Sequence, residues 1–174
     1  MTTLARAARS ERRGQSESPS VRILSVIDGK TLARLVLNAV GTVGSAELNP
    51  PATGTTTAYH SRVLLAMLTY CYTIGVYGSQ EVEEMMYSDA EFRSLCGMNY
   101  PDWRQLKRFR RRNHEPLRRS LKETFRGAWR LTGQPGVPSA TEARPEGDAL
   151  PEWLAAEAQS RIDQAMFIDQ MAEE

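Results

Sequence analysis

Residues 101–130 form the most strongly charged segment of this 174-residue chain. Eleven lysine and arginine residues against three acidic residues give the segment a net charge of +8, whereas the formal net charge of the whole chain is +1. Leu106 and Phe109 lie among the basic residues at helical spacing, so the pattern predicts a helix with one apolar and one basic face. Such a concentration of positive charge is typical of a protein that binds a polyanion.

The rest of the composition is typical of one globular domain. Hydrophobic residues make up 41% of the sequence, which is enough for a core if the polar ends stay outside it. No run approaches 18 apolar residues, so we expect no membrane association. Cys71 and Cys96 lie in apolar segments, which predicts reduced core thiols of a cytoplasmic protein. If the polyanion is DNA, we expect the protein to be associated with the nucleoid.

Turn-forming residues and blocks of charge divide the chain into segments. The N-terminus is polar and aperiodic, which predicts disorder. A candidate strand at 21–26 and a helix capped by Asp28 come next, and a loop rich in Gly, Pro and Thr leads to the helical core. Residues 140–174 carry a net charge of −7. The predicted segments are 1–20 (disordered N-terminus), 21–58 (accessory segment and loop), 59–131 (helical domain), 132–150 (linker) and 151–174 (acidic amphipathic helix).

Residues 59–131 show the apolar periodicity of several helices. A core helix runs from a cap at Ser61 to Gly78, and Ser79 and Asp89 are placed to cap two shorter helices. A turn and the basic helix follow. The predicted fold is therefore an all-α small helical bundle, with a helix-turn-helix-like basic helix, a flexible N-terminus and a separate C-terminal helix.

The basic helix is expected to begin after a cap at Asp102 and to end or kink before Pro116. Its outer face would fit a DNA major groove, because arginine can bind guanine or phosphate and Gln105 can pair with adenine. Basic residues beyond Pro116 would contact phosphates. The predicted nucleic-acid-binding residues are Arg104, Gln105, Lys107, Arg108, Arg110, Arg111, Arg112, Arg118, Arg119 and Lys122.

Five short motifs, in order and at characteristic spacing, resemble the N-terminal domain of bacterial insertion-sequence transposases of the DDE type. The resemblance covers about 60 residues and implies a helical module that binds duplex DNA at the ends of the element. It departs at Trp103, where the family usually has histidine. The motifs are Tyr59–His60, Ser79–Glu83, Asp89–Arg93, Pro101–Asp102 and Phe109–Arg112.

The catalytic domain of that family is a ribonuclease-H-like fold with three metal-binding carboxylates, whereas only a linker and one helix follow Arg130 here. We therefore expect a DNA-binding protein of a bacterial insertion sequence that is not itself an enzyme. His60 and His114 have no ligand-spaced partners, so we expect no metal site. The sequence also has no phosphate loop, GxSxG or CxxC motif, so we expect no cofactor and no catalytic residues. The expected partners are double-stranded DNA and, in addition, a second copy of the chain or a catalytic subunit acting in trans.

Other interpretations of the charge pattern stay open. The basic helix could be a solvated surface that binds an acidic partner, and the charge alone fits RNA as well as DNA. The protein could also be an interaction or regulatory module. Its acidic C-terminal helix would then bind a partner or fold over the basic helix as a DNA mimic.

Overall fold

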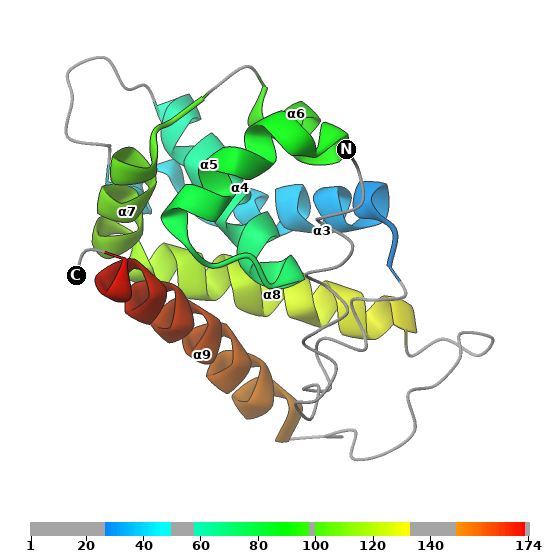
Figure 1. Cartoon of the computed structure of the whole chain (residues 1–174). Helices are drawn as coiled ribbons and strands as arrows, with labels where there is room; N and C mark the ends of the chain where they lie inside the picture. The colour runs from blue at the N-terminus through cyan, green and yellow to red at the C-terminus, as the bar shows by residue number, and fades with distance from the viewer. Residues whose placement is uncertain (1–26, 50–57, 98–99, 133–148, 173–174) are drawn as a thin grey trace, which may run out of the picture.

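The computed structural model describes residues 27–49, 58–97, 100–132 and 149–172, and these residues are helical almost throughout (Figure 1). None of them forms a strand, which confirms the predicted all-α bundle. The predicted disordered N-terminus, the candidate strand and most of the linker lie outside the described residues. The elements are α3 (Gly29–Gly41), the 3-10 helix η1 (Ser45–Glu47), α4 (Ala58–Ile74), α5 (Ser79–Ser88), α6 (Ala90–Cys96), α7 (Trp103–Arg112), α8 (His114–Thr132) and α9 (Ala149–Met171).

Helix α4 is the centre of the bundle. Arg62 is its only charged residue, and Leu65, Met67, Leu68 and Tyr72 are fully buried. A helix that is apolar on most sides must be covered on most sides. Helices α3, α5, α6, α7, α8 and α9 accordingly all pack against α4. The predicted core positions of Cys71 and Cys96 are confirmed, because both thiols are buried.

Helix α8 forms a second layer that carries both α3 and α9 (Figure 1). The apolar face of α9, with Leu154, Ala158, Ile162 and Ala165 fully buried, belongs to the same core as α4 and α8. The C-terminal helix is thus part of the bundle, and its predicted separate position is wrong. Helix α9 docks on the bundle because removing its continuous apolar face from water is favourable.

Aspartates cap the N-termini of three helices, as predicted. The carboxylates of Asp28, Asp89 and Asp102 accept hydrogen bonds from the third residue of the following helix, at 3.0, 2.8 and 2.7 Å respectively. The two predicted serine caps are wrong, since α4 begins at Ala58 and Gly78 precedes α5. No helix in the described ranges is long and apolar enough to cross a membrane.

Candidate nucleic-acid interface

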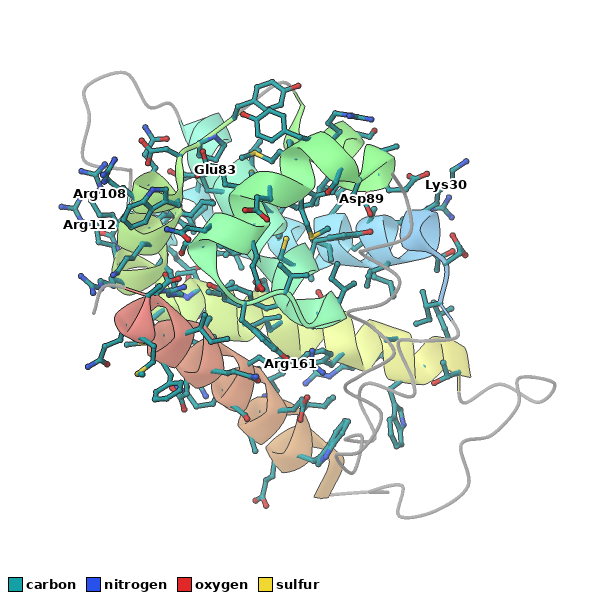
Figure 2. All side chains as sticks on the ribbon, viewed as in Figure 1. Lys30, Glu83, Asp89, Arg108, Arg112 and Arg161 are labelled. Atoms are coloured by element: carbon teal, nitrogen blue, oxygen red, sulfur yellow. The ribbon has the colours of Figure 1, made fainter. Side chains whose placement is uncertain are left out.

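Helix α7 presents an exposed row of four arginines, which we call the arginine stripe: Arg104, Arg108, Arg111 and Arg112. Their spacing of four, three and one residues places them on one side of the helix, over a length of about 12 Å. None of the four forms an ion pair with another described residue. Figure 2 shows Arg108 and Arg112 pointing away from the body of the protein.

Local contacts order the stripe, and none of those that the structure describes involves an acidic side chain. The Arg104 guanidinium lies 4.7 Å from the centre of the Trp103 ring, and Arg108 Nε donates a 3.3 Å hydrogen bond to the Arg104 carbonyl oxygen. Gln105, a predicted base-reading residue, is half-buried at the edge of this surface.

The basic residues of α8 differ from the stripe because most of them are already paired with acids. Arg118 donates two hydrogen bonds to Glu115, at 2.9 and 2.7 Å, and Arg119 pairs with Glu47 at 2.7 Å. Lys122 is half-buried and forms no ion pair with a described residue. Two of the three residues of α8 that were predicted to contact phosphates therefore already have an acidic partner.

Two predicted contact residues lie on the other side of α7. Lys107 is 5% exposed and Arg110 is 1% exposed, so neither is available at the surface. The Lys107 ammonium nitrogen lies 3.5 Å from the Asp169 carbonyl oxygen. The predicted outward position of Lys107 and the inclusion of Arg110 among the surface contacts are therefore wrong, because α9 covers this side of the helix.

Arg110 belongs to a buried polar cluster that joins α4, α5, α7 and α9, which we call the Asp169 clamp. The guanidinium donates to the Tyr72 hydroxyl at 2.8 Å and to the Asp169 carboxylate at 2.6 Å. Asp169 also accepts from the Ser79 amide at 2.8 Å and the Ser79 hydroxyl at 2.5 Å. The carboxylate thus sits at the N-terminus of α5, where the helix dipole favours negative charge.

The clamp holds its members in defined protonation states. Burial alone would raise the pKa of Asp169, but the Ser79 hydrogen bonds and the Arg110 charge outweigh it and lower that pKa below its ordinary value. Burial opposes the charge of Arg110, yet Tyr72 and Asp169 raise its pKa further. Burial raises the pKa of Tyr72 to about 12, so the phenol stays neutral.

A second buried arginine fastens α9 to the end of α4. Arg161 donates to the carbonyl oxygens of Tyr72 and Thr73, at 2.7 and 3.0 Å, and these carbonyls lie in the last turn of α4. It also pairs with Glu157 at 2.8 Å and lies 5.1 Å from the centre of the Phe125 ring. A cation at a helix C-terminus satisfies carbonyls that have no partner within the helix.

Helix α7 is fixed at both ends by further polar contacts. At its start, the Trp103 amide donates to the Glu83 carboxylate of α5 at 3.1 Å. At its end, buried Asn113 accepts from the Asn49 amide at 2.8 Å and donates to the Asn49 carbonyl at 3.1 Å. The same side chain donates to the Phe109 carbonyl at 3.0 Å. The arginine stripe is therefore carried by a rigidly held helix.

Neither the Asp169 clamp nor the Arg161 contacts were foreseen from the sequence. A signal was present, because Asp169 follows Ala165 by four positions on the apolar face of α9. A charged residue at such a position needs a buried partner. Among the described residues, no three histidine, cysteine or acidic side chains are grouped so that they could hold a metal ion.

Comparison with known sequences places the chain in a family. The sequence model of a family described as "Transposase domain (DUF772)" matches residues 9–112, which is more than half of the chain. The match ends at the last residue of α7 and so includes the whole arginine stripe. No curated protein and no solved structure matches the chain. The chain belongs to the transposase domain (DUF772) family.

Proposed function

We propose that this protein binds duplex DNA through the arginine stripe of α7, and that its target is the end of a mobile element. The observation that carries the proposal is the stripe itself: four exposed arginines on one side of a fixed helix, none of them paired with an acid in the described part of the chain. Membership of a transposase-related family supports DNA as the polyanion. The resemblance to transposase N-terminal domains supports the end of the element as the site.

The dimensions of the stripe fit this role. The major groove of B-DNA is about 12 Å wide and admits one α-helix, and arginine can bind guanine or phosphate with two parallel hydrogen bonds. Helix α5 packs against α7 and would brace it, as the first helix of a helix-turn-helix does. We therefore narrow the principal contacts to Arg104, Arg108, Arg111 and Arg112, with Gln105, Arg118, Arg119 and Lys122 as flanking contacts.

The alternative in which the acidic C-terminal helix folds over the basic helix as a DNA mimic receives less support. Helix α9 does contact the basic helix, but Asp169 meets Arg110 on the side opposite the stripe. The described part of α9 thus leaves Arg104, Arg108, Arg111 and Arg112 exposed. A structural role for α9 fits these contacts better than a DNA mimic does. A second copy or a catalytic subunit in trans stays a prediction.

The test is a binding titration with labelled duplexes. Wild type should bind the DNA flanking its own gene more tightly than a scrambled duplex. Arg108→Met/Arg112→Met should lose about 1–3 kcal/mol of binding free energy for each arginine that reads a base. The matched control is Arg118→Met/Arg119→Met on α8, where both arginines are already paired and a smaller loss is expected. Equal losses in the two double variants would contradict the assignment to α7.

A further inference from the structure

An open groove of about 300 Å³ lies between α7 and α9, directly beside the arginine stripe. Arg111 is a member of the stripe and also lines this groove. Buried Arg110 contributes to the α7 side as well, and its Nε has no hydrogen-bond partner among the described residues. The α9 side consists of Asp163, Met166, Phe167 and Gln170.

Helix α9 exposes several large apolar side chains in and next to the groove. Phe167 is 62% exposed, Met166 is 43% exposed, and Met171 one turn further along is 53% exposed. Three of the large exposed hydrophobic side chains of the described residues thus lie within six residues. Clustered apolar exposure of this kind marks a binding surface more often than an isolated exposed residue does.

We propose that this groove holds one unpaired nucleotide at the end of a DNA duplex that lies along the arginine stripe. The inference rests on the proposed function and adds a ligand class to it. The base would stack on Phe167, because aromatic side chains bind the faces of unpaired bases irrespective of sequence. Its phosphate would reach Arg111, and the Gln170 amide and the Asp163 carboxylate would meet the polar edge of the base.

The observations favour a nucleotide over a protein partner. A stable interface needs about 800 Å² from each partner, whereas the three exposed side chains offer on the order of 100 Å² each. The volume of the groove, about 300 Å³, falls within the range of small-molecule sites, which suits a single nucleotide. The groove is also continuous with the stripe through Arg111, so phosphates bound along α7 would lead directly into it. Asp163 would repel a phosphate but can accept a hydrogen bond from an exocyclic amine.

The experiment compares three duplexes that share one sequence: a blunt duplex, one with a single unpaired nucleotide, and one whose overhanging nucleotide is abasic. Both overhang polarities are tested by anisotropy with the full chain. Wild type should prefer the overhang with a base over the abasic one by about 5- to 100-fold. Phe167→Ala should abolish that preference and leave the affinity for the blunt duplex unchanged. Met171→Ala removes another exposed apolar side chain of the same helix that does not line the groove, and it should keep the preference.

The outcomes separate this inference from the proposed function. Tight binding of all three duplexes with equal affinity would overturn the nucleotide site alone. So would a Phe167→Ala variant that loses self-association in sedimentation, since the surface would then belong to a second copy of the chain. If wild type binds none of the three duplexes, the proposed function is overturned and this inference with it.

Discussion

Arg108 and Arg110 lie two residues apart on α7 and have opposite environments. Arg108 is exposed and pairs with no acid among the residues that the structure describes, whereas Arg110 is 1% exposed and bonded to Tyr72 and Asp169. In the sequence, both belong to the same run of basic residues. The structure divides that run into a binding side and an anchoring side.

The difference shows that net charge overstates the surface available to a polyanion. The clamp uses Arg110 to hold α9, and the described ion pairs of α8 use Arg118, Arg119 and Arg126 locally. On α7, the arginines that form no ion pair within the described ranges are those of the arginine stripe. The stripe can be rigid because the opposite side of the same helix is tied to α4 and α9.

The largest expected effect is on Arg110. Arg110→Met should lower the free energy of unfolding by about 3–5 kcal/mol, because it leaves the buried Asp169 carboxylate without its cation. Urea denaturation followed by circular dichroism measures this loss. Arg108→Met, the same substitution on the exposed side, should stay within about 0.5 kcal/mol of wild type. Similar stabilities of the two variants would remove the distinction between the two sides.

The clamp should also show coupling between its two charges. In a double-mutant cycle of Arg110→Met and Asp169→Asn, the double variant should be more stable than the sum of the single losses predicts. A coupling free energy of about 1–3 kcal/mol is expected for residues in direct contact in one network. Additive losses would mean that Asp169 does not depend on Arg110.

A smaller loss is expected where α7 ends. Asn113→Ala removes the side chain that bonds Asn49 and Phe109, and should cost about 1–2 kcal/mol of unfolding free energy. Gln164→Ala, at an exposed position of α9, serves as the surface control and should be nearly neutral. Equal stability of the two variants in thermal unfolding would show that the Asn49 contact does not hold α7.

The pH dependence of the clamp should be the smallest effect. The pKa of Asp169 is lower in the folded protein than its ordinary value of 3.8, so its ionised form favours folding. This contribution is fully present above about pH 4 to 5 and is lost as pH falls through the lowered pKa. The stability difference between wild type and Asp169→Asn should therefore be constant near neutrality and shrink in acid. A difference that grows in acid would contradict the sign of the shift.

Much of the fold follows from local patterns, as the caps at Asp28, Asp89 and Asp102 show. The buried side of α7 was partly readable too, since Arg110 follows Leu106 by four positions and shares its side of the helix.

Other features depended on distant parts of the chain. Burial of Lys107 requires α9, which lies about 60 residues further on, and periodicity carries no information about such a neighbour. Ser79 has the pattern of a cap, but its hydroxyl bonds Asp169 because the docked α9 brings that carboxylate to α5. The groove beside Arg111 likewise forms only because α9 docks next to α7. Tertiary packing, rather than local propensity, decides which charges face solvent.

The most direct test of separate roles for the two sides of α7 is the salt dependence of duplex binding. If the four arginines of the stripe each displace about one counterion, the log–log slope for wild type should be roughly −3 to −4. Arg108→Met/Arg112→Met should make the slope shallower by about two, with unchanged unfolding free energy. An unchanged slope in this variant, or no binding of wild type at low salt, would contradict the assignment of the stripe as the DNA-binding surface.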